Sequence, residues 1–389
     1  MSGPAKRAAF RFVLTMGIVN LFADTTYEGG ASINGPFLGS LGATAATVGM
    51  VAGCGEFLGY TLRSISGYVA DRTGRFWPIT FVGYTINLLA VPAMALAGRW
   101  ETAATFLILE RVGRAFRKPT VEAMLSYSAG TLGRGWVYGL NTALDETGAT
   151  LGPLLIAFAL HRGASYRTGY AWLIVSSLCA LAALTVARTT FPVPAKLEEG
   201  APKLAAPSRF TPRFWISMVG AACFGAGLMS FELISFHLAS HGGLCPALIP
   251  VALALATVAG IAASLALGRL YDRVGLPVVL AAMAAAAMFS PLVFLGGRVA
   301  LLGGMALWGL GYAVQDSLLK AVVAGMLPEG KRSLAFGLFY SGYGVGWLVG
   351  GIATGALYTR SLRGLVVFSV VSQLAAIPLF LFASRREAS

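Results

Sequence analysis

The sequence is poor in charged residues: only 12% of its 389 residues are Asp, Glu, Lys or Arg. In contrast, 57% of the residues are hydrophobic, and the mean hydropathy is +0.74. A soluble chain of this length needs much more polar surface to cover its core. The composition therefore excludes a soluble globular protein and indicates an integral membrane protein.

Several chemical signatures are also absent. The chain has no Gly-x-x-x-x-Gly-Lys-Ser/Thr phosphate loop, which excludes an ATP-driven pump of the P-loop type. The four cysteines, at positions 54, 179, 223 and 245, lie in or at the ends of apolar runs without metal-ligand spacing, so we expect packing thiols and no disulfide framework. We expect no enzyme activity, no cofactor and no metal, and an ion or substrate gradient must supply any energy.

The formal net charge is +13, a balance that in a soluble protein would suggest nucleic-acid binding. Here the basic residues separate apolar runs of roughly 20 residues, the length that crosses a bilayer as a helix, so no nucleic-acid partner is expected. The predicted fold is an all-α integral membrane protein with twelve transmembrane helices. The predicted spans are 9–36, 44–70, 77–98, 100–126, 134–160, 168–188, 213–240, 246–270, 276–297, 299–327, 333–358 and 364–384.

The distribution of basic residues orients these spans. Twenty of the 29 Lys and Arg residues fall in segments that face the cytoplasm if the N-terminus is cytoplasmic. The positive-inside rule therefore predicts that both termini are cytoplasmic. The first apolar run is too long for a cleavable signal peptide and lacks a small-residue cleavage site, so we expect it to remain as a span of a plasma (cytoplasmic) membrane protein.

One phrase occurs twice, as Gly67-Tyr-Val-Ala-Asp71-Arg72-Thr-Gly74-Arg75 and, 201 residues later, as Gly268-Arg-Leu-Tyr-Asp272-Arg273-Val-Gly275. Glycines at 148 and 152 also match glycines at 346 and 350, at an offset of 198. Such internal similarity is typical of transporters built from two matched halves. Residues 189–212 contain five prolines and suit a linker. The predicted domains are therefore a six-helix bundle at 1–188, a cytoplasmic linker at 189–212 and a second bundle at 213–389.

With these motifs the chain resembles the major facilitator superfamily over essentially its whole length. The loop at Gly67–Arg75 resembles the signature that this family carries after its second span, and Gly148-Ala-Thr-Leu-Gly152-Pro153 resembles the motif of its antiporters. The resemblance implies two bundles that rock about a central site, which opens alternately to each side. It also implies a drug:proton antiporter-like mode of action.

Each motif has a physical role. Glycines permit a tight turn, and an aspartate at the membrane edge accepts hydrogen bonds from a helix N-terminus or a basic neighbour. We therefore predict a gating role for Gly67, Asp71, Arg72, Gly74, Arg75, Asp272 and Arg273. The antiporter-like residues Gly148, Gly152 and Pro153 either seal the bundles or simply allow close helix packing.

Charged residues inside the spans carry most of the functional information, because each costs at least about 2.5 kcal/mol at mid-span unless it is paired. An Asp or Glu that changes partners as the bundles move can load and release a proton. The predicted proton-coupling and substrate residues are Asp24, Glu28, Glu56, Arg63, Glu110, Arg111, Arg114, Asp145, Glu146 and Glu232. The alternative is that Glu56 with Arg63, and Glu110 with Arg114, form structural ion pairs. We expect Arg117, Lys118 and Lys320 near the cytoplasmic edge, with their head groups extended into water.

Aromatic residues near these charges, above all Tyr27, Tyr340 and Tyr343, are candidates for lining a substrate cavity. The leading hypothesis is a monomeric, proton-coupled exporter of small amphipathic molecules. The alternative is a secondary transporter of an anionic metabolite that binds to intramembrane arginines. A receptor or scaffold without transport activity is disfavoured, because it needs neither a duplicated loop motif nor midplane charges.

Overall fold

The computed structural model describes residues 3–132, 134–194, 211–241, 244–319 and 332–385. The regular structure of these residues is helical, which confirms the predicted all-α membrane protein. The helices of the first half are α1 (Gly3–Ser40), α2 (Ala45–Thr73), α3 (Phe76–Ala93), the 3-10 helix η1 (Met94–Leu96), α4 (Trp100–Leu132), α5 (Arg134–His161) and α6 (Tyr166–Thr190). Those of the second half are α7 (Pro212–Leu228), α8 (Phe231–Ser240), α9 (Leu248–Val274), α10 (Leu276–Ala287), α11 (Phe289–Phe294), α12 (Arg298–Ala313), the π-helix η3 (Val314–Leu318), α14 (Arg332–Arg360) and α15 (Leu362–Arg385).

Within the described residues, each predicted span coincides with one helix or with two consecutive helical segments, and residues 320–327 of the predicted span 299–327 lie outside the described residues. The span at 213–240 is divided into α7 and α8, and the span at 276–297 into α10 and α11. Within the described residues, eight helical segments are long and apolar enough to cross a membrane. They confirm a multi-pass membrane protein, whereas the total of twelve crossings stays a prediction.

Contacts between Cα atoms divide the chain into two units. Unit 1 comprises Met1–Ala31 and Ile65–Leu204, and unit 2 comprises Ser32–Ser64 and Ala205–Ser389. The end of α1 and the first two thirds of α2 thus group with the second half of the chain. The predicted assignment of these helices in full to an N-terminal bundle stays a prediction, and residues 195–210 of the predicted linker lie outside the described residues.

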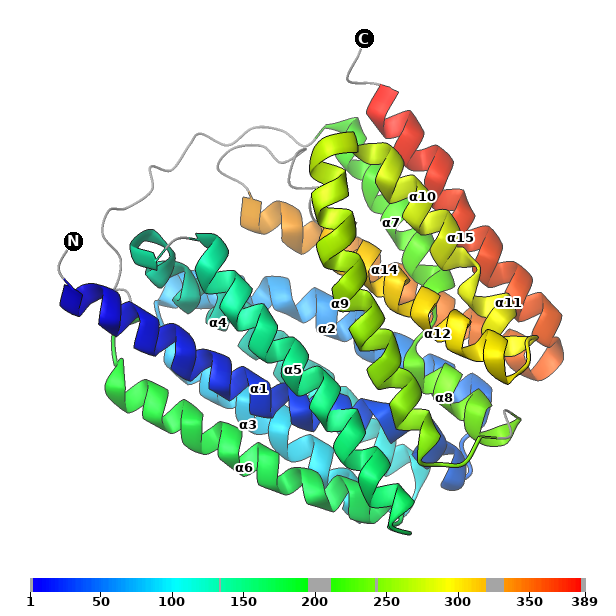
Figure 1. Ribbon diagram of the computed structural model, residues 1–389, viewed down its shortest axis with the longest axis horizontal. Coiled ribbons are helices and arrows are strands. Elements are labelled where there is room, and N and C mark those ends of the chain that lie inside the picture. Colours follow the sequence, from blue (N-terminus) through cyan, green and yellow to red (C-terminus); the bar gives the residue numbers. More distant parts are fainter. Residues whose placement is uncertain (1–2, 133, 195–210, 242–243, 320–331, 386–389) are drawn as a thin grey trace. The chain divides into compact units, whose positions relative to one another are not determined.

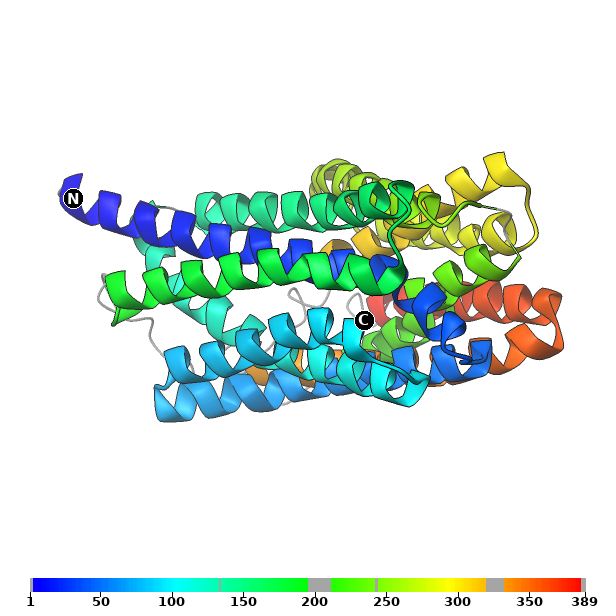
Figure 2. The same cartoon turned by 90° about the horizontal axis from the view of Figure 1, so that it is seen from below.

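In unit 1 the helices α1, α3, α5 and α6 run side by side (Figures 1 and 2), and α4 packs along α3. The core between them is apolar and contains fully buried Phe12, Met16, Tyr84 and Leu184. In unit 2, α7 packs against both α14 and α15, and α9 packs against α12. Each unit therefore has a helical framework of its own on which polar side chains are positioned.

Glycine contacts at two matched helix crossings confirm the internal repeat. In unit 1, Gly148 and Gly152 of α5 face the backbone carbonyls of Leu21 and Thr25 on α1 so closely that an added Cβ would collide with them. In unit 2, the corresponding glycines of α14 face the carbonyls of Ala222 and Ala226 on α7 in the same way. The partners are 201 residues apart and the glycines 198 apart, so both halves use one crossing geometry, which small residues permit.

The repeated phrase also forms the same local structure in both halves. Its first copy ends α2 and its second ends α9, and in each case the glycine after the last turn has a positive φ, +65° at Gly74 and +78° at Gly275. Its N–H donates to the carbonyl four residues earlier, at 2.8 Å in both copies. Glycine is the residue that adopts this left-handed helix end without strain, which explains its presence at both sites.

The break between α7 and α8 was not predicted. Met229 has φ +59°, a conformation that side-chain-bearing residues rarely adopt, and it interrupts the helix before Ser230. The freed carbonyls of Leu228 and Met229 accept hydrogen bonds from the indole N–H of Trp308, at 3.2 and 3.1 Å. A buried helix end needs such a partner, so a residue 79 positions away makes the break possible.

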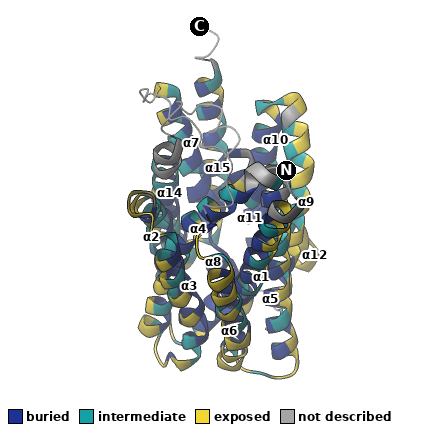
Figure 3. Cartoon of the chain, turned by 90° about the vertical axis from the view of Figure 1, so that its left-hand side faces the viewer, coloured by how far each residue is buried: buried dark blue, intermediate teal, exposed yellow. Residues whose placement is uncertain are grey.

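Exposed residues lie along the outward-facing sides of the helices (Figure 3), and many of them are large hydrophobic residues. On α6 the exposed side chains include Val175, Leu178 and Val186, and on α15 they include Val367 and Val371. In water such rows would be aggregation sites, whereas in a bilayer they face lipid. This apolar outer surface agrees with a multi-pass membrane protein.

The glycine crossings predict that a glycine-to-alanine substitution destabilises the protein at a crossing but not elsewhere. Gly152→Ala and Gly350→Ala should each lower the free energy of unfolding by about 1–3 kcal/mol, because the added methyl group forces two backbones apart. Gly303→Ala in α12 meets no atom within 4 Å and should be neutral or slightly stabilising, since alanine favours the helix. Thermal unfolding in detergent measures all three, and equal midpoints would contradict the crossing geometry.

Candidate functional site

An ion pair between α1 and α4 lies in the interior of unit 1. Arg117 Nη2 donates to Asp24 Oδ1 at 3.0 Å, and the two side chains are 8% and 20% exposed. The same guanidinium lies 4.8 Å from the ring centre of Tyr84 on α3. Residue 117 was predicted to lie near the cytoplasmic edge with its head group in water, so its burial against a carboxylate corrects that interpretation.

A second set of charged side chains lies nearer the start of α4. Asn87 of α3 donates to Glu110 Oε1 at 2.7 Å, and the other oxygen of Glu110 pairs with Arg111 Nε at 3.4 Å. Arg111 also donates to the hydroxyl of Tyr27 on α1. The Arg114 guanidinium lies 4.2 Å from the centre of the same Tyr27 ring. Cation–π contacts of this kind hold both arginines against α1.

A chain of hydrogen bonds connects α3, α1 and α5. The Tyr84 hydroxyl donates to Asn20 Oδ1, the Asn20 amide donates to Asn141 Oδ1 at 2.9 Å, and the Asn141 amide donates to Asp145 Oδ2 at 3.2 Å. The other oxygen of Asp145 is buried and accepts no hydrogen bond from the described residues. A buried carboxylate oxygen of this kind can be satisfied by a proton or a cationic ligand.

These groups form one electrostatic cluster, which we call the charge cluster. Glu28 interacts with Asp24, Arg111, Arg114 and Glu146, and Asp145 interacts with Asp24, Arg117, Lys118 and Glu146. The structure thus brings together seven of the predicted residues: Asp24, Glu28, Glu110, Arg111, Arg114, Asp145 and Glu146. With Arg117 and Lys118, the cluster has five carboxyl groups and four cationic groups, so it carries one excess negative charge when all are ionised.

The remaining predicted charges lie in unit 2. Glu56 on α2 and Glu232 in the first turn of α8 are buried. Arg63 on α2 lies with its guanidinium 4.9 Å from the ring centre of Tyr60. The structure therefore divides the predicted charges between the two units, and their common role in coupling stays a prediction.

Aromatic residues gather in unit 2 around Tyr60 of α2. Its ring is stacked on Tyr340 at 5.8 Å between centroids and 14° between planes, and it meets the edge of Tyr343 at 5.5 Å and 87°. Its hydroxyl accepts a hydrogen bond from the Gln315 amide at 2.6 Å. Two of the three predicted cavity aromatics thus contact each other through a residue that the sequence did not single out.

The predicted gating residues lie at the ends of α2 and α9, where Arg72, Gly74, Arg75 and Arg273 are exposed. The Arg72 guanidinium donates to the Tyr68 hydroxyl at 2.8 Å. The side chains of Asp71 and Asp272 lie outside the described part of the structure. The latch role of this motif therefore stays a prediction.

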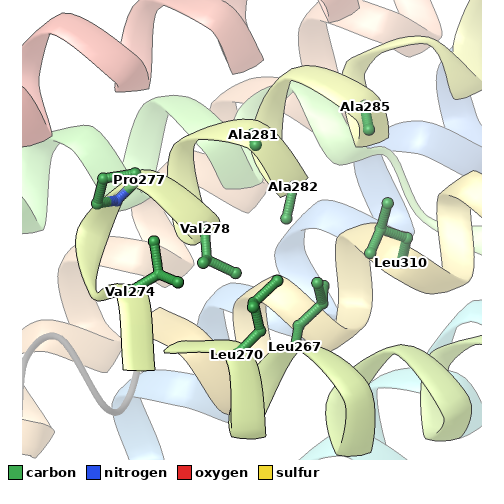
Figure 4. A pocket seen from close by; sticks show the side chains of 9 residues that line it. All are labelled: Leu267, Leu270, Val274, Pro277, Val278, Ala281, Ala282, Ala285 and Leu310. Carbon is green, nitrogen blue, oxygen red and sulfur yellow. The ribbon is translucent and has the colours of Figure 1, made fainter. Parts of the chain in front are cut away.

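A pocket of about 400 Å³ lies where α9 turns into α10 (Figure 4). Its lining is aliphatic and includes Leu267, Leu270, Val274, Val278 and Leu310. Among the residues that the structure describes, no charged side chain lines it, so these residues offer nothing that would orient a polar substrate or bind a proton. The charge cluster and the aromatic group around Tyr60 are better candidates for function.

Sequence reasoning missed the uncharged polar residues of these sites. Asn20, Asn87, Asn141 and Gln315 each hold a neighbouring functional side chain through a hydrogen bond. A usable signal was present, because all four amides lie within predicted membrane spans. A buried amide in such a span must find a partner, just as a charge must.

Comparisons with known proteins identify relatives along the whole chain. A model of the Major Facilitator Superfamily matches residues 13–319 and 246–389. Uncharacterized proteins of Mycobacterium tuberculosis and Mycobacterium bovis are 36% identical over 384 residues, which cover 97% of this chain and 94% of theirs. An uncharacterized MFS-type transporter of Methanocaldococcus jannaschii is 25% identical over 393 residues, which cover 95% of this chain and 94% of that protein.

Solved structures share the fold at low sequence identity. The nucleoside transporter NupG matches with a TM-score of 0.74 and 13% identity, over 96% of this chain and 98% of that chain. A peptide transporter POT in complex with sulfate matches with a TM-score of 0.76 and 14% identity, over 96% of this chain and 94% of that chain. At these identities the likeness establishes the fold and does not extend to the substrates.

The buried ion pair predicts a sharp dependence of stability on one carboxylate. Asp24→Asn should lower the free energy of unfolding by about 3 kcal/mol, because it leaves the Arg117 charge buried without its partner. The double variant Asp24→Leu/Arg117→Met should recover most of this loss, since no lone charge remains. Denaturant unfolding in detergent measures the cycle.

The matched control is Arg72→Met, which removes an exposed guanidinium and should change stability by no more than about 0.5 kcal/mol. If Asp24→Asn is as mild as this control, the pair does not stabilise the fold.

Proposed function

Because this chain belongs to the Major Facilitator Superfamily, whose members are secondary transporters, we propose that it exports small amphipathic molecules in exchange for protons. Membership of the family supports alternating access to a substrate site. The proposed proton-coupling element is the charge cluster of α1, α4 and α5. The observation that carries this proposal is the buried Asp24–Arg117 pair with Asp145 beside it.

The arrangement of Asp24, Arg117 and Asp145 supports proton exchange. Two carboxyl groups on different helices share the field of one guanidinium, and only one of them is within ion-pairing distance of it. A small movement of α5 relative to α1 would exchange the partner, and a carboxylate that loses its cation binds a proton more readily. The coupling follows from helix movement alone and requires no further cofactor.

The excess negative charge of the cluster favours a proton or a cation as its ligand. Arg111 and Arg117 each lie against a carboxylate, so they are better suited to holding carboxylates in place than to holding an anion. This pairing counts against the alternative in which the arginines bind an anionic metabolite. Competition for the same carboxylates would link substrate release to proton uptake.

The antiporter-like motif in α5 supports exchange of substrate for protons. Gly148 and Gly152 lie against α1 at the level of Leu21 and Thr25, next to Asp24. Close packing at this point excludes water from the side of the charge cluster, and a dry cluster is what prevents protons from crossing without substrate. The same motif in α14 lacks a proline, so the two crossings are not fully equivalent.

Transport of ethidium into proteoliposomes tests this proposal. With the membrane potential clamped, an inside-acid pH gradient should drive accumulation of ethidium, and a protonophore should abolish it. Asp145→Asn should reduce gradient-driven accumulation at least tenfold, because a carboxyl that carries the proton is removed. Binding of ethidium should be weaker at low pH, since protonated carboxyls do not attract a cation.

The matched control is Glu122→Gln, an exposed carboxyl on α4, which should transport like the unmodified protein. Accumulation that is independent of the pH gradient would contradict proton coupling. Benzoate transport that is abolished by Arg111→Gln, without ethidium transport, would instead establish the anion alternative.

A further inference from the structure

The Tyr60 side chain occupies a slot formed by residues that lie far from it in the sequence. The slot consists of Gln315 in the π-helix η3 and of Tyr340, Tyr343 and Trp347 on α14. Tyr340 supplies the face on which the Tyr60 ring is stacked, Tyr343 supplies an edge, and Gln315 donates to the hydroxyl. Each feature of a phenol, its flat face, its edge and its oxygen, therefore has a partner.

The slot contains a buried polar atom that Tyr60 does not satisfy. Gln315 Oε1 is buried and accepts no hydrogen bond from the described residues, whereas the buried Tyr343 hydroxyl and Trp347 indole N–H interact with each other. The three side chains are 6%, 1% and 3% exposed. An unsatisfied buried polar atom costs about 1–3 kcal/mol, and one that belongs to the same amide that holds the Tyr60 hydroxyl is best explained by a ligand that satisfies it in another state.

The walls of the slot are held in place by their packing. Tyr343 and Trp347 lie against Gly225 of α7, where an added Cβ would be 3.0 Å from the Tyr343 ring and 3.3 Å from the Trp347 ring. Gln315 lies in a five-residue π-helix, a geometry that is rare and is frequent at functional sites. The slot therefore belongs to the helices of the second half of the chain, whereas its occupant comes from α2.

Tyr60 is the member of this group that comes from the first half of the repeat, although in this structure its part of α2 belongs to unit 2. The internal repeat assigns α2 to the first half of the chain, and α14 and η3 to the second. Alternating access, on which this inference rests as part of the proposed function, requires the helices of the two halves to separate in turn. When α2 withdraws, the stacking face of Tyr340 and the Gln315 amide are uncovered together.

We propose that this slot is a binding site for a flat aromatic ring that carries a hydroxyl group, and that Tyr60 fills it as an internal substitute when no substrate is bound. The substrate would have a phenol-like portion, with its ring against Tyr340 and its oxygen on Gln315. Its remaining polar atoms would pair with Tyr343 and Trp347. Occupancy of the slot by Tyr60 and binding of the substrate ring are then mutually exclusive.

Calorimetric binding of 2-naphthol to the detergent-purified protein tests this proposal. Tyr60→Ala should tighten binding at least fivefold, because an occupied slot lowers the apparent affinity by the fraction of molecules in which it is open. Adding Tyr340→Ala to that variant should weaken binding about tenfold through loss of the stacking face. Adding Tyr340→Phe should preserve it. Gln315→Leu should weaken binding of 2-naphthol but leave that of naphthalene unchanged.

The control is Tyr358→Phe, which changes an aromatic residue of α14 that contacts His237 and His241 outside the slot. Binding should be unchanged in this variant. Weaker or unchanged binding in Tyr60→Ala, in protein that remains monodisperse with an unchanged helical spectrum, would overturn the proposal. The measurement is independent of proton coupling, because it needs no gradient: failure of ethidium exchange would leave it standing, and failure here would leave proton exchange standing.

Discussion

The cost of a lone charge or a lone amide in an apolar interior is the constraint on which the rest of this structure depends. Few charged residues occur in the chain, and several of those that are buried within the helices are held by specific partners on other helices. Asp24 fixes α1 to α4 through Arg117, and Asn141 fixes α5 to α1 through Asn20. The same bonds that position the functional groups thus determine how the helices of unit 1 are rotated about their axes.

Close backbone contact supplies the complementary constraint. Apolar side chains gain nothing by leaving lipid for another apolar surface, so helices associate where packing is tight. At the crossings of α5 with α1 and of α14 with α7, glycines bring backbones into contact, and at the first of these crossings Asn20 and Asn141 are also within hydrogen-bonding distance. The crossing therefore sets the distance between helices, and the ion pair sets their rotation.

The repeat and the helix boundaries could be predicted from the sequence because they depend on local patterns. A glycine after a basic last turn defines the ends of α2 and α9, and apolar length defines the spans. The partners of the buried charges could not be predicted, because spacing along one helix does not reveal which side chain of another helix lies opposite. Arg117 was thus assigned to the membrane edge, and Tyr60 was overlooked although Tyr340 and Tyr343 were selected. The break at Met229 depends on Trp308 and leaves no local signal.

Comparison of the two halves suggests how duplication yields two kinds of site. The offset of 198 that relates the glycines of α5 and α14 places Tyr343 at the position of Asp145. The offset of 201 that relates their partners on α1 and α7 places Gly225 at the position of Asp24. In unit 1 these positions hold two interacting carboxyls, and in unit 2 they hold a tyrosine ring lying on a glycine. One crossing geometry thus presents charge in one half and a flat apolar surface in the other.

A duplicated protein in which both halves kept the charges would need partners for twice as many buried carboxyls. Exchanging one set for aromatic rings removes that cost, and under the proposed function it would also provide a surface for an amphipathic substrate beside a proton site.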